Sequence, residues 1–289
     1  MKKPLPSIAL AAPLLLVMFV FFVIPLLLVA GFSFMAASPY GGVLPRFSLD
    51  AYTQILFEHD FDGTLHWSAA YLDVFVRSLT YAGVATIVCA VIGIPAACYM
   101  ATLPHVHRAR WVMLVTIPFW SSLLIRTYAW MLLLRSEGVI NSFLINTGII
   151  DAPLPLLYNG FAVGLGLTYS YLPFMILPVY ASLERMDWRL TDAAADLYAK
   201  PWQILRHVVL PHSWPGIIAG AVLVFIPAIG SFLASDLLGG GKEMMIGNLI
   251  QIQFSFARDW PFGAAASVVL MITVMAGTWL LSLSTRKKT

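Results

Sequence analysis

Six stretches of the chain are almost wholly apolar and are separated by short polar segments. Each is long enough to cross a membrane, since a hydrocarbon core of about 30 Å needs about 20 mostly apolar residues in a helix. The stretches lie at about residues 8–34, 72–101, 111–134, 160–183, 216–237 and 262–283. The pattern predicts an all-α membrane protein with six transmembrane helices.

The amino-acid composition fits a lipid environment and excludes several other classes of protein. Of the 289 residues, 60% are hydrophobic and 11% are charged, whereas soluble domains average about 45–50% apolar and about 25% charged residues. The 17 Lys and Arg against 14 Asp and Glu leave a net charge of only +3. These values exclude a soluble enzyme, a disordered chain and a nucleic-acid-binding protein. We predict a single transmembrane domain over residues 1–289.

The first apolar stretch follows Lys2 and Lys3, which is also the charge pattern of a secretory signal peptide. Its apolar run is much longer than the roughly 7–15 residues of a signal peptide. We therefore interpret it as a retained span that is kinked at Pro13 and Pro25.

The distribution of Lys and Arg predicts the orientation, because cytoplasmic loops carry an excess of these residues. With a cytoplasmic N-terminus, the inner segments hold Lys2, Lys3, Arg108, Arg110, Arg185, Arg189, Lys200, Arg206, Arg286, Lys287 and Lys288. The outer loops then hold only Arg46, Arg135, Lys242 and Arg258. Both termini are thus predicted to be cytoplasmic. The outer loop 135–159 is expected to contain a short amphipathic helix.

The inner loop at 185–211 has more structure than a linker needs. Thr191 is expected to cap a helix that has Asp192 in its first turn, where negative charge favours the helix dipole. Ala193, Ala194 and Ala195 are strong helix formers that present a small, flat surface.

A second short helix is expected in the same loop. Lys200 precedes a proline and should leave the first helix, and Pro201 suits the first position of the next one. Pro211 is expected to end it. The two helices would form a projection with a small apolar tip and a charged rim, which is suited to docking on another protein.

This loop carries a resemblance to a known family. The stretch Asp192-Ala-Ala-Ala-Asp-Leu-Tyr-Ala-Lys-Pro-Trp, with Val209-Leu210-Pro211 at its end, resembles the EAA loop of ABC importer permeases. Asp192 stands where the family has Glu, and Tyr198 replaces the family's Gly. In that family the loop inserts into a groove on a cytoplasmic ATPase. The resemblance implies a coupling role for Asp192, Ala193, Ala194, Asp196, Tyr198, Pro201, Leu210 and Pro211.

Further segments are similar to spermidine/putrescine-type permeases. They are Pro118-Phe-Trp-Ser-Ser-Leu-Leu-Ile-Arg-Thr-Tyr-Ala-Trp130, Gly138-Val-Ile-Asn141, Ile226-Pro-Ala-Ile-Gly230, Leu237-Leu-Gly-Gly240 and Arg258-Asp-Trp-Pro-Phe-Gly263. The resemblance implies a type I ABC importer permease in a bacterial inner (plasma) membrane, working by alternating access. It also implies a second permease subunit, two ATPase subunits that bind ATP and Mg²⁺, and a solute-binding protein outside.

The sequence gives this chain no catalytic site of its own. It contains no GxxxxGK[ST] motif to cradle ATP phosphates, so ATP hydrolysis is expected in a partner. His105 and His107 form an H-x-H pair that has no third ligand nearby for a metal. We found no nucleophile–base set, and we expect this chain to bind no cofactor or metal.

Five residues are candidates for lining a route for a cation. A polyamine needs carboxylates for its ammonium groups and aromatic faces for cation–π contacts. The candidates are Trp120, Arg126, Tyr128, Trp130 and Asp236. For the aromatic residues, ordinary packing or an interfacial belt is the alternative. For Arg126 the alternative is a structural partner, either Asp236 or Glu137.

Two other features have structural interpretations. Asp73 and Arg77 are four residues apart and are expected to pair with each other. Gly216 and Gly220 have the small-xxx-small spacing that lets helices approach closely, here against a second permease subunit.

Alternative functions stay open at the level of the sequence. An ion-gradient-driven secondary transporter would show paired acids at mid-membrane and an internal repeat. A membrane enzyme would need a buried catalytic set. The same ABC machinery could also carry an opine, an aminophosphonate or another small solute.

Overall fold

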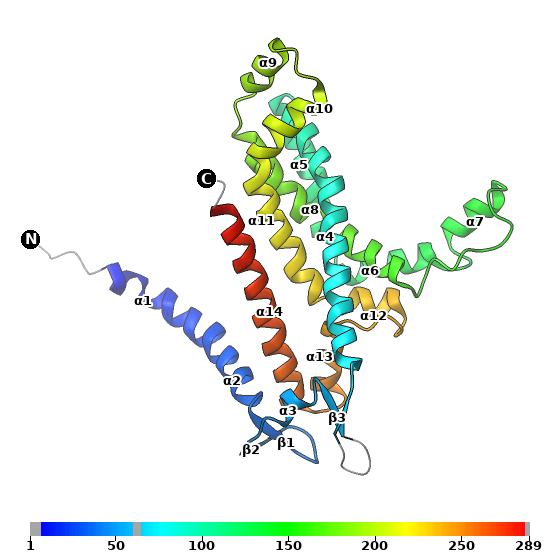
Figure 1. The fold of residues 1–289 in the computed structure, drawn as a ribbon. Helices are drawn as coiled ribbons and strands as arrows, with labels where there is room; N and C mark the ends of the chain where they lie inside the picture. Colours follow the sequence, from blue (N-terminus) through cyan, green and yellow to red (C-terminus); the bar gives the residue numbers. More distant parts are fainter. Residues whose placement is uncertain (1–6, 60–64, 287–289) are drawn as a thin grey trace, which may run out of the picture. The chain divides into compact units, whose positions relative to one another are not determined.

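The structure is a computed structural model that describes residues 7–59 and 65–286. The terminal lysines at positions 2, 3, 287 and 288, which contribute to the predicted orientation, lie outside the described residues. Most of the described chain is helical (Figure 1). The helices are α1 (Ser7–Met18), α2 (Ile24–Phe32), α3 (Asp50–Thr53), α4 (Ala70–Thr102), α5 (His105–Thr116), α6 (Leu123–Leu134), α7 (Val139–Asn146), α8 (Gly160–Glu184), α9 (Arg189–Asp196), α10 (Pro201–Ile204), α11 (Leu210–Ile229), α12 (Leu233–Gly239), α13 (Ile246–Ser255) and α14 (Trp260–Arg286).

The remaining regular elements are short. Two π-helical turns, η1 (Phe19–Val23) and η3 (Leu205–Val209), and one 3₁₀ turn, η2 (Ile117–Trp120), interrupt or join the helices. Four strands, β1 (Met35–Ala37), β2 (Val43–Phe47), β3 (Phe57–His59) and β4 (Leu65–Trp67), form two antiparallel hairpins.

Within the described residues, five helical stretches are long and apolar enough to cross a membrane, or six if one bent pair is counted as a single span. The spans expected at 72–101, 160–183 and 262–283 correspond to α4, α8 and α14. The first expected span is helical from Ser7 to Phe32, with the π turn η1 just before Pro25. The fold class predicted from the apolar pattern is confirmed.

The third span is not the single straight helix expected at 111–134. The chain bends by 89° between the segments His105–Trp120 and Leu123–Asn146. Pro118 lies in η2 and has no N–H to donate, and Ser121 and Ser122 follow it in extended conformation. The Ser121 hydroxyl bonds back to the Pro118 carbonyl at 2.9 Å. Proline and backbone-bonding serines both oppose a continuous helix, and their combination breaks this one.

The fifth span also differs from the expected 216–237. Helix α11 ends at Ile229, and Ser231 and Phe232 separate it from the short helix α12. The Asn248 side-chain amide donates to the Phe232 carbonyl at 3.0 Å. The Phe232 carbonyl also accepts the Asp236 N–H of α12 at 2.9 Å, whereas the Ser231 N–H bonds back to the Ala228 carbonyl at 3.2 Å. The α-helical hydrogen bonds are therefore interrupted before Phe232 and resume in α12. Asp236 therefore does not close the fifth span, but lies on α12.

The chain divides into two compact units. The first consists of Met1–Leu72 and Leu249–Met275 and contains both hairpins. In its first hairpin Met35 pairs with Phe47 and Ala37 with Val43, and the turn uses Gly41 and Gly42 at φ of 90° and 88°. In this unit Asp259 accepts a hydrogen bond from the Phe262 N–H at 3.1 Å and so caps α14.

The second unit consists of Asp73–Asn248 and Ala276–Thr289. Its centre is the packing of α8 against α11, with Val163, Leu167, Met175, Val179 and Val224 fully buried. Within this unit, α6 and α7 project sideways from α4, α8 and α11 (Figure 1). Helix α7 confirms the short helix expected in the 135–159 segment.

Candidate functional site

The loop at 185–211 forms the predicted helix–turn–helix, but its first helix starts earlier than expected. Helix α9 begins at Arg189, whose N–H donates to the Asp187 carboxylate at 3.0 Å. Thr191 lies inside the helix and its hydroxyl bonds to the Trp188 carbonyl at 2.6 Å. The expected cap at Thr191 is therefore wrong, because Asp187 provides the side-chain acceptor two residues before the helix.

Helix α9 ends through Tyr198. This residue has φ of 59°, in the left-handed region, and its N–H bonds to the Ala195 carbonyl at 2.9 Å. The Ala199 N–H bonds to the Ala194 carbonyl at 3.1 Å, which completes a glycine-type helix end. Tyr198, which stands where the family has glycine, thus still forms the tight turn, in a left-handed backbone conformation that is costly for a residue with a side chain.

Pro201 is the first residue of the second helix, as predicted. The Lys200 N–H donates to the Gln203 side chain at 2.8 Å and so caps this turn. Pro211 does not end the helix, contrary to expectation. The π turn η3 directly precedes α11, so the helix runs from Pro201 to Ile229. A wide turn beside a proline is one of the few ways a helix tolerates the missing N–H.

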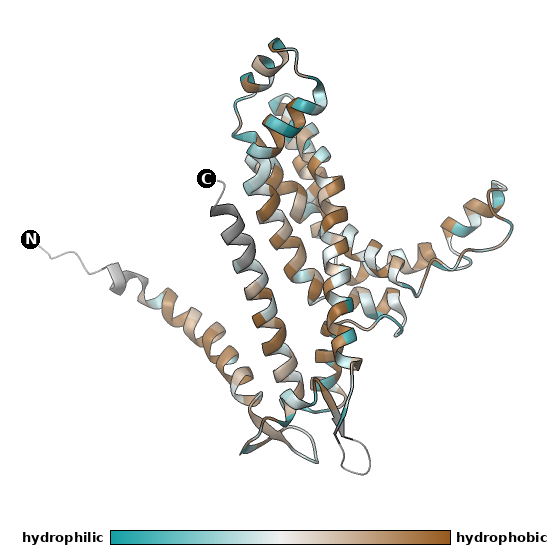
Figure 2. Ribbon diagram, in the orientation of Figure 1, coloured by the Kyte–Doolittle hydropathy of each residue, from teal (hydrophilic) through white to brown (hydrophobic). Residues whose placement is uncertain are grey.

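The tip of the loop exposes apolar side chains. Leu197 is 82% exposed, Tyr198 is 96% exposed and Trp202 is 65% exposed. Asp192 and Asp196 are exposed on the same projection, and Ala193 and Ala194 lie between them. Figure 2 shows hydrophilic residues concentrated in α9 and α10, whereas α4 and α11 are mostly hydrophobic. An apolar tip flanked by charged residues of both signs, Asp196 and Lys200 among them, is suited to a protein partner with a complementary groove.

The loop is joined closely to the α8–α11 pair. The Ser182 hydroxyl donates to the His212 carbonyl at 2.9 Å. A Cβ added at Gly216 would lie 2.5 Å from the Pro178 carbonyl oxygen, and one at Gly220 would lie 2.8 Å from the Met175 sulfur. These two glycines therefore serve packing within this chain, not the contact with a second subunit suggested by their spacing. Movement of the loop would be transmitted directly into α8 and α11.

Helix α6 carries three of the five candidates for the translocation path. It packs against α8 and against α12, the helix that carries Asp236. Trp130 packs edge-on against Tyr169 with ring centroids 5.5 Å apart. This contact favours ordinary packing for Trp130 over a place on the solute path. Tyr128 is 44% exposed, and Trp120, on η2 just before the break, is 91% exposed. The isolated chain leaves both rings free to contact another molecule.

Arg126 has an unusual environment. Its Nε and Nη1 atoms are buried without a hydrogen-bond partner. Neither Asp236 nor Glu137 pairs with it within the described residues, so the expected structural partner is wrong. Its charge acts on the Tyr171 hydroxyl, which itself donates to the Pro227 carbonyl at 3.2 Å near the end of α11. Arg126 is thus a partly buried cation near the break in the fifth span.

A cluster around Glu243 was not predicted. The Tyr81 hydroxyl donates to the Glu243 carboxylate at 2.6 Å, and the Arg77 guanidinium lies 3.8 Å from the same oxygen. Arg77 also donates to the Lys242 carbonyl at 2.9 Å. The expected Asp73–Arg77 pair is wrong, because the segment after α12 offers Arg77 two acceptors. Each of these contacts joins residues more than 160 positions apart, so no local pattern indicates the cluster.

The structure gives no indication of a metal site in the part of the chain that it describes. No group of three or more His, Cys, Asp or Glu side chains lies close enough to hold an ion there.

Comparison with known proteins gives close relatives by sequence, although no protein-family model matches the chain. The spermidine/putrescine transport system permease protein PotB of Escherichia coli (strain K12) is 42% identical over 266 residues, covering 92% of this chain and 91% of that protein. PotB of Haemophilus influenzae is 40% identical, covering 88% of this chain and 85% of that protein. The inner membrane ABC transporter permease protein YdcU of Escherichia coli (strain K12) is 37% identical over 220 residues, covering 72% of this chain and 70% of that protein.

Solved structures share the fold at low sequence identity. A chain of a bacterial ABC transporter involved in the import of the acidic polysaccharide alginate matches with a TM-score of 0.78 at 16% identity, covering 98% of this chain and 96% of that chain. A second structure of an alginate ABC transporter, in complex with a periplasmic protein bound to an alginate pentasaccharide, matches with a TM-score of 0.73 at 17% identity, covering 97% of this chain and 94% of that chain. These likenesses concern the fold alone.

Proposed function

The chain belongs to the family of ABC transporter permeases that includes PotB, and from this premise we propose that it forms half of the path of an ATP-driven polyamine importer. The observation that carries the proposal is the 42% identity to PotB over 92% of the chain. Family membership also removes the ion-gradient-driven transporter and the membrane enzyme as alternatives.

We infer that the 185–211 loop couples this chain to a separate ATPase. Its exposed apolar tip at Leu197, Tyr198 and Trp202 supports a protein contact. The helix from Pro201 to Ile229 supports transmission, because closure of an ATPase around the tip would move α11 as a lever. ATP and Mg²⁺ would be bound by that partner, and this chain would contribute no catalytic group.

We propose three kinds of protein partner. They are two ATPase subunits at the loop, a second permease subunit that completes the path, and a soluble solute-binding protein outside. The fold likeness to an alginate transporter solved with a periplasmic binding protein supports the last of these. We place the chain in a bacterial inner membrane with both termini in the cytoplasm, as the distribution of Lys and Arg predicts.

The polyamine route would pass the paired breaks of the third and fifth spans. Broken helices near the middle of a membrane expose backbone groups and line transport sites in other transporters. Trp120 and Tyr128 would offer aromatic faces to an ammonium group, and Asp236 would offer a carboxylate. Arg126 lies beside the same region and would repel a polycation that came close, so it would limit where the solute can rest.

The test of this function is uptake of labelled spermidine and putrescine in cells that lack the chain and then regain it. The proton gradient is collapsed while ATP is maintained. Uptake that returns with the chain and survives the collapse is the expected result. Loss of uptake on collapse would contradict ATP drive. Absence of uptake for both polyamines would contradict the proposal that the solute is a polyamine. Uptake of opines and aminophosphonates would then be measured with the same cells.

A further inference from the structure

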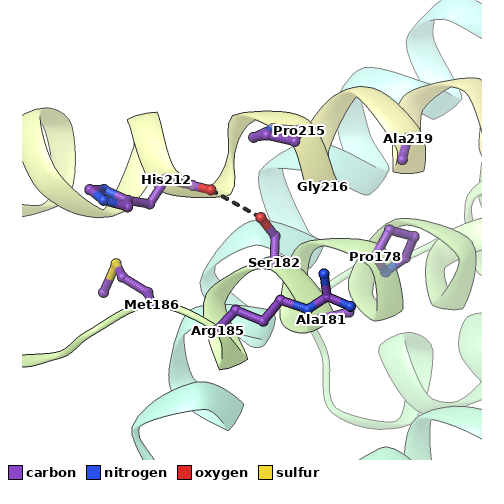
Figure 3. Close-up of a pocket in the computed structure, with 9 residues that line it drawn as sticks. All are labelled: Pro178, Ala181, Ser182, Arg185, Met186, His212, Pro215, Gly216 and Ala219. Carbon is purple, nitrogen blue, oxygen red and sulfur yellow. Dashed lines mark hydrogen bonds between the residues drawn. The ribbon is translucent and has the colours of Figure 1, made fainter. Parts of the chain in front are cut away.

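A cleft of about 550 Å³ lies between α8 and α11 where both helices meet the 185–211 loop. Nine residues line it, all labelled in Figure 3, among them Pro178, Ala181 and Arg185 on one side and His212, Pro215 and Ala219 on the other. Its volume is within the range of about 300–1,000 Å³ that small-molecule sites occupy. Figure 3 shows residues of α8 and α11 facing each other across it.

The polar groups of the cleft favour an anion. Arg185 is exposed, and among the described residues its guanidinium has no acceptor. The neighbouring carboxylate of Glu184 accepts a hydrogen bond from Tyr180 at 2.9 Å, and none of the nine lining residues is acidic. The guanidinium points back along α8 toward Ala181 and Pro178 (Figure 3). A positive charge beside an apolar wall, with no counter-ion among the residues that the structure describes, is suited to binding an anion.

His212 supplies a second polar group of defined chemistry at the other end of the cleft. Its Nδ1 lies 2.7 Å from the Val208 carbonyl oxygen. A carbonyl only accepts hydrogen bonds, so Nδ1 carries the hydrogen and Nε2 of the neutral ring is left as an acceptor. The imidazole of His212 lies beside Met186 and away from the Arg185 guanidinium (Figure 3). The cleft thus offers a cation from Arg185 and, apart from it, an imidazole acceptor from His212, and the Ser182 hydroxyl, which donates to the His212 carbonyl, also lines it.

The remaining wall is apolar and follows the membrane-spanning helices. Pro178 and Ala181 on α8, and Pro215 and Ala219 on α11, extend the cleft by about two helical turns, or roughly 10 Å. A free phosphate would use only the Arg185 end and leave this wall bare. A phospholipid would use both, since its phosphate meets the arginine and its acyl chain covers the wall.

We propose that this cleft binds an anionic phospholipid with a hydroxyl-bearing headgroup, of the phosphatidylglycerol type. The phosphate pairs with Arg185, a headgroup hydroxyl donates to Nε2 of His212, and an acyl chain lies along Ala181 and Ala219. The predicted topology places Arg185 at the cytoplasmic end of its span, where basic pockets between helices bind anionic headgroups. The bound lipid would hold the base of the loop and so support coupling, whichever solute the transporter carries.

The first test measures lipid retention by the complete transporter, purified with its partner subunits. Native mass spectrometry compares the wild type with Arg185→Gln after exchange into vesicles of phosphatidylcholine containing phosphatidylglycerol. One basic residue near a membrane surface contributes about 1 kcal/mol, so retention of phosphatidylglycerol is expected to fall about fivefold. Arg110→Gln, which removes an exposed arginine of α5, is the matched control and should retain the lipid. Equal retention by Arg185→Gln would overturn the proposal.

The second test separates the lipid from other occupants. Ala219→Phe narrows the apolar wall at an exposed position and keeps both polar groups. Ala219→Phe should also lower the retention of phosphatidylglycerol, whereas the occupancy of a site for a small anion would not change. Inorganic phosphate should not displace the lipid, and displacement would assign the cleft to a free anion.

Disulfide cross-linking of Ala219→Cys to a second permease subunit in native membranes would assign the cleft to that subunit. None of these measurements uses polyamine uptake, so their outcome does not depend on which solute the transporter carries.

Discussion

Tyr198 occupies a backbone position that favours glycine. A left-handed conformation costs a residue with a side chain roughly 1–2 kcal/mol, and the cost is greatest for β-branched residues. Tyr198→Gly should therefore stabilise the end of α9, and Tyr198→Ile should loosen it. The measurement is hydrogen exchange at the Ala199 amide, whose bond to the Ala194 carbonyl closes this helix end. Exchange should slow in the glycine variant and quicken in the isoleucine variant. The same rate in both would show that the turn carries no strain.

The hydrogen bond from Tyr81 to Glu243 should matter more than the ion pair beside it. Hydrogen bonds to charged groups contribute about 1.5–3 kcal/mol, whereas partly exposed ion pairs contribute about 0–1 kcal/mol. The Tyr81 bond is 2.6 Å long and partly buried, whereas the ion pair is 3.8 Å long and the bond from Arg77 to the Lys242 carbonyl is exposed to solvent, so both Arg77 contacts should contribute less. Tyr81→Phe is therefore expected to lower the melting temperature of the purified protein more than Arg77→Gln does. The reverse order would mean that Arg77 stabilises this region mainly through the Lys242 carbonyl.

These residue-level contacts mark a limit of prediction from sequence. The i, i+4 spacing favoured an Asp73–Arg77 pair, but spacing contains no information on the acceptors that a distant loop brings. Arg77 pairs with Glu243 because folding places the segment after α12 against α4. Thr191 failed as a cap for a related reason, since Asp187 was an equally suitable acceptor a few residues earlier.

At the scale of the element, apolar length predicted most of the helices but not their breaks. The length of an apolar stretch indicates how far a helix can extend, and the bounds of α4, α8 and α14 agree closely with the apolar stretches. The breaks in the third and fifth spans coincide with side chains that donate to backbone carbonyls there, such as Ser121 to the Pro118 carbonyl and Tyr171 to the Pro227 carbonyl. The sequence contains these residues, but only the folded chain shows which carbonyl each one meets.

The close contact of α8 with α11 can be tested through two glycines that differ in surroundings. A Cβ at Gly216 would meet backbone atoms of α8, whereas a Cβ at Gly164 would meet nothing within 4 Å. Overpacking costs about 1–3 kcal/mol, while Ala for Gly in a helix gains up to about 1 kcal/mol. Gly216→Ala should lower the melting temperature and Gly164→Ala should preserve or raise it. A neutral Gly216→Ala would show that the two helices separate easily.

At the scale of the whole molecule, Asp236 tests the proposed route for the solute. Asp236 is exposed on α12 and has no ion pair within the described chain. Asp236→Asn removes one charge from an exposed position, so uptake at limiting polyamine should fall severalfold while the maximal rate and ATP hydrolysis are preserved. Asp151→Asn, at an exposed acid of the 135–159 loop, is the control. An unchanged concentration dependence would assign Asp236 a structural role.

The proposed coupling role of the 185–211 loop can be tested only in the whole assembly, because it requires the partner ATPase. Asp192 is an exposed carboxylate in the first turn of α9, next to the small surface of Ala193. A lysine at this position reverses the charge presented to the ATPase, and like charges brought together across an interface cost several kcal/mol, which corresponds to more than about a tenfold loss of affinity. Asp192→Lys should therefore abolish transport and the ATPase activity stimulated by the binding protein, while the chain still inserts into the membrane at the normal level.

The control for this variant is Asp151→Lys, which makes the same charge reversal on an exposed residue outside the loop and should leave transport intact. Co-purification of the ATPase separates two causes of a loss. An ATPase that no longer co-purifies with Asp192→Lys would locate the defect in docking, as the exposed tip predicts. An ATPase that stays bound but is no longer stimulated would locate it in the lever from Pro201 to Ile229. Normal transport by Asp192→Lys would remove the loop from the coupling mechanism, because no other carboxylate in the first turn of α9 replaces it.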